Sequence, residues 1–310
     1  MTDEEMWDGT GVRPFAVPIN DDFAREAVET LRGYREMVEK CLMGTIDPSP
    51  DSPLGREMAS VNATPDPLGA NRGSFHKMLL EIAIMSWDTT LDHVRALEHD
   101  IARRPAPVWS PLVLARAALE SCLVFDYLCE PEITGALRFA RGAGLWRKDT
   151  NYSMSLAKIL GQDEQGAALD AYITKAFEEC NIVARTNTSG KITGYIVDGA
   201  VANLDYNITD RTASRLPEWI PMPYGLLSGA AHGRPWMTDR ARHIGEGTGA
   251  LVGEAATVVA ALQAVMAALE MGVRTWQGYF GLTLEARLRD LDQYRQLMSL
   301  RLLAFAHAAE

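Results

Sequence analysis

Apolar residues recur every three to four positions along most of the chain, and clusters of Pro, Gly and Asp interrupt this pattern. That period is typical of amphipathic helices. It predicts helices over residues 21–41, 74–102, 111–129, 132–147, 151–161, 164–185, 223–234, 249–280 and 283–309. Strand signals are weak, because one short β-branched run within 186–205 predicts at most a small hairpin or an ordered loop. We therefore expect an all-α fold, a multi-helix bundle with long central helices.

Residues 44–72 are rich in Pro, Asp and Ser, and this composition predicts one long irregular loop. Loops of that length are uncommon in compact domains and often serve as lids or binding arms. The pattern divides the chain into an N-terminal helix with an irregular loop arm (1–73) and a helical bundle domain (74–310).

An ion pair stands out within the apolar helix predicted at 111–129. Ser110 is its predicted N-cap, with proline at the first helical position. Arg116 and Glu120 lie one turn apart among apolar residues, and a charged group is rarely buried unless it is paired. Tyr127 lies on the same side of the helix. We expect these side chains to share a buried polar network.

A second segment, 223–235, carries polar residues on one side of a helix made of small and apolar residues. Tyr224, Ser228 and His232 are spaced four and four, which places them on the same face. We infer that this face and the Arg116 face lie against each other. Arg234 and Trp236 follow at the helix end, where a cation beside an aromatic ring is suited to an anionic or flat ligand.

The residue types suggest roles at this site. His232 is the candidate general acid or base, because imidazole titrates near neutral pH. Glu120 would orient the ring or share its proton, and Arg116 would neutralise an anion. The predicted ligand-binding residues are Tyr224, Ser228, Tyr127, Arg234 and Trp236. The competing interpretation is a structural network that contains a core histidine.

The segments Leu114-Ala-Arg-Ala-Ala-Leu-Glu120 and Tyr224-Gly-Leu-Leu-Ser-Gly-Ala-Ala-His-Gly233 resemble a group of uncharacterised actinobacterial all-helical proteins, over residues 75–240. The resemblance implies an all-helical fold with facing helices and no assigned reaction. More distantly, the arrangement is similar to HEPN-type helical domains, whose ribonucleases use an Arg-x(4–6)-His motif. Arg301 and His307 have this spacing, one that arises often by chance in a chain rich in arginine.

The helix predicted at 74–102 presents Glu81, Asp88, Asp92 and His99 on one face. They could form a metal-binding face, but the pattern favours the solvated stripe of an amphipathic helix. The chain contains no Glu-x-x-His and no zinc motif, so the sequence specifies no metal and leaves the cofactor unknown.

The spacing of several acidic residues is similar to that of class I terpene cyclases, which are also helical. Asp88 and Asp92 stand where the aspartate-rich motif of that family would fall, and Asp210, Ser214 and Glu218 have the spacing of its second magnesium triad. The chain lacks the adjacent Asp pair of the family. A terpene-cyclase-like lyase is therefore an alternative only.

The composition of the chain limits the classes of partner that it is expected to bind. A net charge of −11 over 310 residues gives no basic surface for nucleic acid. Four cysteines without a Cys-x-x-Cys pair are expected to be reduced and structural, and the acidic N-terminus has no signal sequence, which favours a cytoplasmic location. Residues 248–273 are rich in Ala and Val, but Glu254, Gln263 and Glu270 interrupt them, as in a bundle core helix and unlike a membrane span.

Together these observations predict an intracellular protein with a buried polar site for a small molecule, with acid–base catalysis as its candidate role. The alternatives are a HEPN-like ribonuclease or toxin-type protein, the lyase, and a structural or oligomeric protein. In the last, the polar network only fixes helix register and the long apolar helices form a homodimer.

Overall fold

The computed structural model describes residues 19–43, 47–204, 206–216, 220, 223–234, 242–245, 248–251 and 254–307. The helices are α1 (Asp21–Cys41), α2 (Pro53–Ala63), α3 (Leu68–Ala102), α4 (Ser110–Cys129), α5 (Gly135–Ile159), α6 (Asp163–Glu179), α7 (Ile208–Arg215), α8 (Pro223–Ala231), α10 (Ala255–Phe280) and α11 (Glu285–His307). The strands are β1 (Val183–Thr186), β2 (Ile192–Val197), β3 (Ala200–Asn203), β4 (Arg242–Gly245) and β5 (Thr248–Leu251). The fold is mostly helical, as predicted, but it is not strictly all-α.

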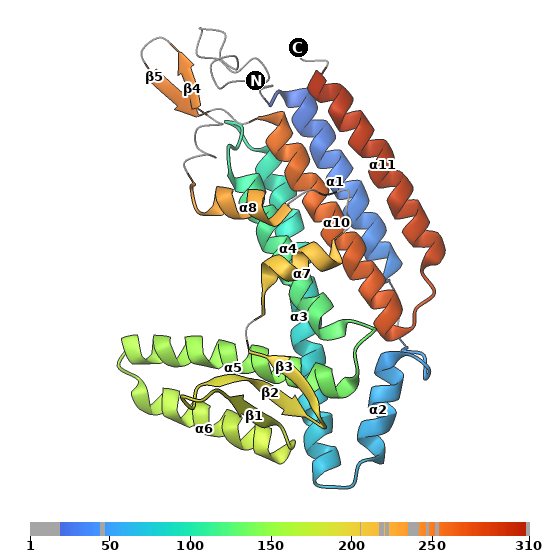
Figure 1. The fold of residues 1–310 in the computed structure, drawn as a ribbon. Helices are drawn as coiled ribbons and strands as arrows, with labels where there is room; N and C mark the ends of the chain where they lie inside the picture. The colour runs from blue at the N-terminus through green and yellow to red at the C-terminus, as the bar shows by residue number, and fades with distance from the viewer. Residues whose placement is uncertain are drawn as a thin grey trace.

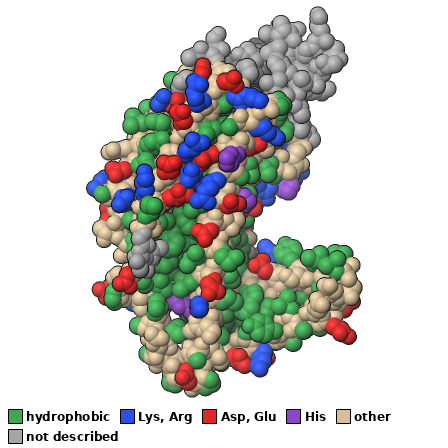
Figure 2. Space-filling model, turned by 180° about the vertical axis from the view of Figure 1, so that it is seen from behind, with side chains coloured by type: hydrophobic (Ala, Val, Ile, Leu, Met, Phe, Trp, Pro, Cys, Tyr) green, Lys and Arg blue, Asp and Glu red, His purple; other side chains and the backbone are tan. Residues whose placement is uncertain are grey.

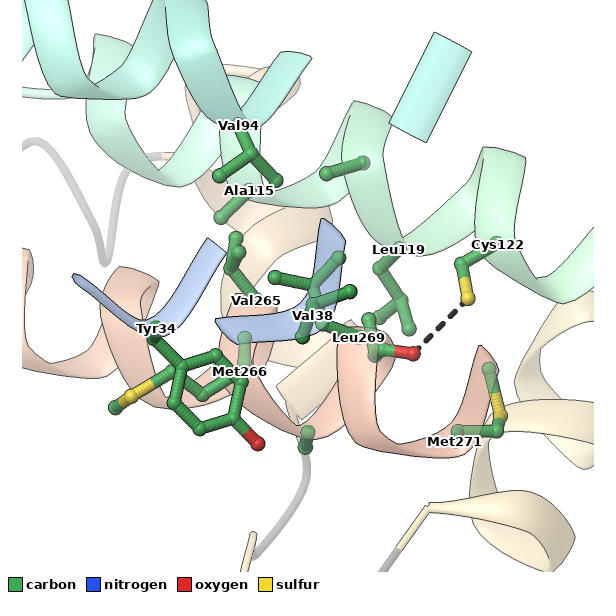
Figure 3. Close-up of a cluster of buried hydrophobic side chains, with 14 of the residues drawn as sticks. Tyr34, Val38, Val94, Ala115, Leu119, Cys122, Val265, Met266, Leu269 and Met271 are labelled. Atoms are coloured by element: carbon green, nitrogen blue, oxygen red, sulfur yellow. Dashed lines mark hydrogen bonds between the residues drawn. The ribbon is translucent and has the colours of Figure 1, made fainter. Parts of the chain in front are cut away.

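The larger part of the molecule is a bundle in which α1, α3, α4 and α11 pack around α10 (Figure 1). Side chains from α1, α3 and α4 meet those of α10 in one apolar core, which Figure 3 shows at Tyr34, Val38, Val94, Ala115, Leu119, Val265, Met266 and Leu269. Among the described helices, α10 alone is long and apolar enough to cross a membrane. However, 78% of its most apolar window is buried inside the bundle, as expected of a core helix.

A second core holds a lobe that projects from the bundle. Helices α5 and α6 and the antiparallel sheet β1–β2–β3 surround it, together with the first part of α3 (Figure 1). Its buried aromatic residues are Phe75, Phe139, Phe177 and Tyr195. Seen from behind, the surface is hollowed between the lobe and the bundle, and acidic and basic side chains are interspersed over the bundle (Figure 2). Helix α3 runs through both cores and joins them.

Helices α3 and α10 approach closely at Gly272, where a Cβ atom would overlap the indole ring of Trp87. We expect Gly272→Ala to lower the free energy of unfolding by about 1–3 kcal/mol, because the core must shift to accept the methyl group. Urea unfolding measures this change. The matched control is Gly225→Ala in α8, where the added Cβ meets no atom within 4 Å and stability should not fall. Equal effects of both substitutions would contradict the close contact.

The prediction of an irregular loop over 44–72 is wrong. Helix α2 occupies its middle, and α3 begins at Leu68, six residues earlier than predicted. The start signal of α2 is present in the sequence, because the Ser52 hydroxyl caps the helix by accepting the Gly55 N–H at 3.0 Å and a proline follows it. The high Pro, Asp and Ser content of the segment is typical of a loop, and the prediction therefore missed this short helix.

Two further predicted boundaries are wrong in the lobe. The helices predicted at 132–147 and 151–161 form the single helix α5, in which the Thr150 hydroxyl is buried and donates to the Trp146 carbonyl at 2.8 Å. The helix predicted at 164–185 ends at Glu179, and the residues that follow form a three-stranded sheet in place of a loop or a small hairpin. Asp198 and Gly199 turn between β2 and β3 with φ of 47° and 84°, which is the conformation that Asp-Gly favours in hairpins.

The starts of two core helices also differ from the prediction. Ser110 is the first residue of α4 and not its N-cap, which is Trp109; the Ser110 hydroxyl donates to Asp100 at 2.5 Å. The helix predicted from residue 249 starts at Ala255, because Thr248–Leu251 forms strand β5. A helix N-terminus at residue 249 therefore does not exist.

Candidate functional site

Helices α4 and α8 meet at Arg116, as the facing polar stripes predicted. The Arg116 guanidinium donates from Nε to Glu120 Oε1 at 2.6 Å, on its own helix. From its Nη2 atom it donates to the Tyr224 hydroxyl of α8 at 3.2 Å, and its Nη1 atom lies 3.2 Å from Nε2 of His232. Arg116 is therefore the centre of the cluster.

The directions of these hydrogen bonds assign the proton positions. A guanidinium can only donate, so the Tyr224 oxygen accepts from Arg116 and its own proton goes to Glu120 Oε1, 3.2 Å away. For the same reason His232 Nε2 accepts from Arg116. An imidazole that accepts on Nε2 carries its donor N–H on Nδ1.

The position of His232 is fixed by the end of α8. The Gly233 N–H donates to the Ala230 carbonyl at 3.2 Å and the Arg234 N–H donates to the Gly229 carbonyl at 3.0 Å. Gly233 has φ of +56°. This pair of bonds closed by a left-handed glycine is a Schellman motif, and it makes His232 the C-cap residue. The imidazole is thereby held at the helix end, where it is exposed.

The cluster passes from partly buried to exposed. The Arg116 side chain is 18% exposed and Glu120 is 32% exposed. Burial and the nearby Glu120 charge raise the pKa of the Tyr224 phenol, so it remains a hydrogen-bond donor at neutral pH. Partial burial acts against the charge of Arg116, but Glu120 outweighs it and raises the pKa of the guanidinium. Arg116 therefore keeps its positive charge.

The other predicted site residues contact His232 less directly than the sequence suggested, or not at all. The side chain that reaches the His232 ring is Arg116, whereas Glu120 binds Arg116 and Tyr224. Ser228 is partly buried on α8, and its carbonyl accepts the His232 N–H at 3.1 Å. Arg234 is exposed beside the histidine. Trp236 lies outside the described residues.

Tyr127 belongs to a second cluster and not to the Arg116 cluster. Its ring lies 4.7 Å from that of Tyr206, and the guanidinium groups of Arg141 and Arg211 lie 4.4 Å and 5.5 Å from its centroid. Burial raises the pKa of its phenol, although Arg141 and Arg211 act to lower it. The expectation that Tyr127 shares the Arg116 network is wrong, because it lies about three turns of α4 beyond Arg116 and faces Arg211 of α7.

Asp126 is the centre of this second cluster and is fully buried. Two arginines of α7 donate to its carboxylate, Arg211 at 2.5 Å and Arg215 at 2.8 Å. The Thr275 hydroxyl of α10 donates to it at 2.7 Å. Glu130, at the end of α4, accepts a second bond from Arg211 at 2.8 Å. The sequence signal was a lone aspartate within Leu-Val-Phe-Asp-Tyr-Leu of the apolar helix.

A third buried cluster joins α2, α3, α5 and α10. The Glu57 carboxylate accepts from Arg138 Nε at 3.0 Å and from the Tyr279 hydroxyl at 2.9 Å. His76 Nε2 lies 3.2 Å from the same carboxylate. Arg138 is 1% exposed, and its guanidinium lies 4.2 Å from the Tyr279 ring centroid. The sequence did not reveal this cluster, because its residues come from four separate elements.

The residues considered for metal binding do not converge. Glu81, Asp88, Asp92 and His99 are all exposed on α3, as expected of a solvated stripe. In the described part of the chain, no group of three or more His, Cys, Asp or Glu side chains is placed to hold a metal ion.

The residues of the two enzyme alternatives form no common site in the described ranges. Asp210 bonds Asn207 next to it, at 2.6 Å, and Glu218 lies outside the described residues. Arg301 lies on α11 and pairs with Glu26 of α1 at 2.7 Å. The side chain of His307 is not among those described.

Comparisons with protein-family models, curated proteins and solved structures found no match for this chain. The chemistry of its own residues therefore carries the functional proposal.

Proposed function

We propose that this protein binds a small anionic molecule, a carboxylate or a phosphate, where α4 meets α8, and that His232 donates a hydrogen bond to it. The observation that supports the proposal is the bonding of Arg116, which links the partly buried Glu120 carboxylate to the exposed imidazole. One side chain thus places a fixed positive charge between a carboxylate and an imidazole.

Arg116 retains donors for a ligand. A guanidinium has five N–H groups, and Glu120, Tyr224 and His232 take three of them. Among the described residues, the other two have no hydrogen-bond partner. They lie on the terminal nitrogens, which is the fork geometry that binds carboxylate and phosphate. The Nδ1 proton of His232 and the exposed Arg234 provide further donors at the same end of α8.

The two nitrogens of His232 have different roles in this proposal. Nε2 accepts from Arg116, so Nδ1 is the nitrogen left to donate a hydrogen bond to the ligand. Glu120 and Tyr224 bind Arg116 and thereby fix the position of the imidazole of His232. They are positioning residues in this proposal, and His232 is the residue that donates a hydrogen bond to the ligand.

The test follows the imidazole nitrogens of His232 by NMR while inorganic phosphate or acetate is added. We expect the Nδ1 signal to move with saturation, and we expect Arg116→Gln to weaken binding by about 10-fold to 100-fold, since hydrogen bonds to charged groups contribute about 1.5–3 kcal/mol. His99, which is exposed on α3, is the matched control, and its signals should not move.

Two results would overturn this function. One is a His232 ring whose signals do not respond to either anion. The other is an Arg116→Gln protein that binds as well as the wild type but unfolds at lower urea concentration, because the cluster would then act only to join α4 and α8.

A further inference from the structure

A cavity of about 290 Å³ lies where the ends of α4 and α7 approach the C-terminal half of α10. Its volume is just below the range of about 300–1,000 Å³ that is usual for small-molecule sites, so it suits a ligand of few heavy atoms. Pro131, Leu216 and Met271 form its apolar wall, and the rest of the lining is charged. The cavity shares no residue with the Arg116 cluster, so it constitutes a separate site.

Two arginines of the lining bind their carboxylate partners with the same side of the guanidinium. Nε and Nη2 of Arg215 donate to Asp126, and Nε and Nη2 of Arg274 donate to Glu270. In the described part of the chain, Nη1 of each arginine makes no hydrogen bond, so it keeps two N–H donors. The side chains are 24% and 59% exposed, and solvent therefore reaches both. The bonds to Asp126 and Glu270 hold these donors in place.

The charges behind Arg215 leave an excess of positive charge at this end of α7. Two buried or half-buried carboxylates, those of Asp126 and Glu130, face three arginines, namely Arg141, Arg211 and Arg215. The guanidinium of Arg215 is therefore suited to a further negative group, and the cavity is the place where its Nη1 atom can meet one.

Glu132 supplies the opposite charge. Its side chain is 66% exposed, and its shortest ion-pair distance among the described residues is 3.9 Å, to Nη1 of Arg215. A separation of 3.9 Å is too long for a hydrogen bond, so the Glu132 carboxylate can turn toward a cationic group without breaking one. Glu270, the other carboxylate of the lining, already binds Arg274 at 2.7 Å. The cavity thus offers guanidinium donors and one carboxylate acceptor beside an apolar wall.

We infer that this cavity binds a small α-amino acid in its zwitterionic form. The ligand carboxylate accepts from Nη1 of Arg215 and Arg274, and its ammonium donates to Glu132. Its side chain lies against Leu216 and Met271, where the small volume admits only a short apolar group. A simple anion or a simple amine would leave one of the charged groups of the cavity without a partner, so the zwitterion is favoured over both.

The probe is L-alanine, compared with propionate, which lacks the ammonium, and with ethylamine, which lacks the carboxylate. The methyl signal of Met271, assigned with Met271→Leu, reports binding by NMR. We expect alanine to move this signal with saturation. Each analogue should bind about 10-fold to 100-fold more weakly, because it loses the hydrogen bonds of one charged group.

Two substitutions test the two ends of the ligand separately. Arg274→Gln should weaken the binding of alanine, and Glu132→Gln should weaken it by about 10-fold without weakening the binding of propionate. Both side chains are more than half exposed, so the fold should be retained. Arg289→Gln is the matched control, because Arg289 is exposed on α11 and does not line the cavity.

Three results would overturn the inference. The first is a Met271 signal that does not respond to alanine. The second is propionate or ethylamine that binds as tightly as alanine, because the site would then recognise only one charge. The third is an equal effect of Glu132→Gln and Arg289→Gln on the binding of alanine.

Discussion

Replacing Asp126 with asparagine is expected to lower the free energy of unfolding by about 3 kcal/mol. The substitution keeps the shape of the side chain but removes the negative charge that faces Arg211 and Arg215. Losing one partner of a buried ion pair costs about 3–5 kcal/mol, because the other charge remains buried without compensation. The lower end applies here, since Glu130 still lies 2.8 Å from Arg211. Urea unfolding at neutral pH measures the change.

The matched control for Asp126 is Glu132→Gln. Glu132 also faces Arg215, but at 3.9 Å and with a side chain that is 66% exposed. An exposed pair of this kind contributes at most about 1 kcal/mol. A loss below 1 kcal/mol for Asp126→Asn, or equal losses for the two variants, would contradict the central role of Asp126 in holding α7 against α4.

The sequence predicted the long helices in part, because their periodic signals are local. The bounds predicted for α1 agree with the structure at both ends, and α4 ends at Cys129 as predicted, since each is an amphipathic or apolar run between clear breaking residues. The polar stripes of α4 and α8 also predicted the contact between Arg116, Tyr224 and His232. There, a charged side chain among apolar neighbours indicated that it must bind polar groups of another helix. The spacing of polar residues in each helix indicated which face of that helix makes the contact.

The parts that the sequence missed depend on contacts between distant segments. Residues 53–63 form a helix whose composition resembles a loop, and packing stabilises it, because Leu54 and Glu57 are both buried in the structure. The sheet β1–β2–β3 is short and depends on the lobe core for stability. Asp126 and Tyr127 follow Arg116 on α4, but nothing in the sequence tells that α7 and not α8 covers them.

Glu57→Gln is expected to have the other large effect, a loss of about 3–5 kcal/mol at neutral pH. Arg138 would keep its charge with almost no exposure to solvent, and the Tyr279 hydroxyl would lose a charged acceptor. The matched control is Asp198→Asn. Asp198 also pairs with an arginine, Arg72, at 2.8 Å, but it is 55% exposed, so the expected loss is below about 1 kcal/mol.

The stability lost in Glu57→Gln should depend on pH, and the direction follows from the pKa of the Glu57 carboxyl. Burial acts to raise the pKa of the Glu57 carboxyl, but His76, Arg138 and Tyr279 outweigh it and hold the pKa below the usual value of 4.5. A carboxyl with a lowered folded-state pKa stabilises the protein above its unfolded-state pKa, and this contribution is lost as the pH falls through the folded-state value. The difference in stability between wild type and Glu57→Gln should therefore be constant above about pH 5.5 and shrink on acidification below about pH 4.5. Urea unfolding of both proteins across this range measures it. A difference that stays constant down to acid unfolding would show that the carboxylate charge of Glu57 does not hold α2 against α5 and α10.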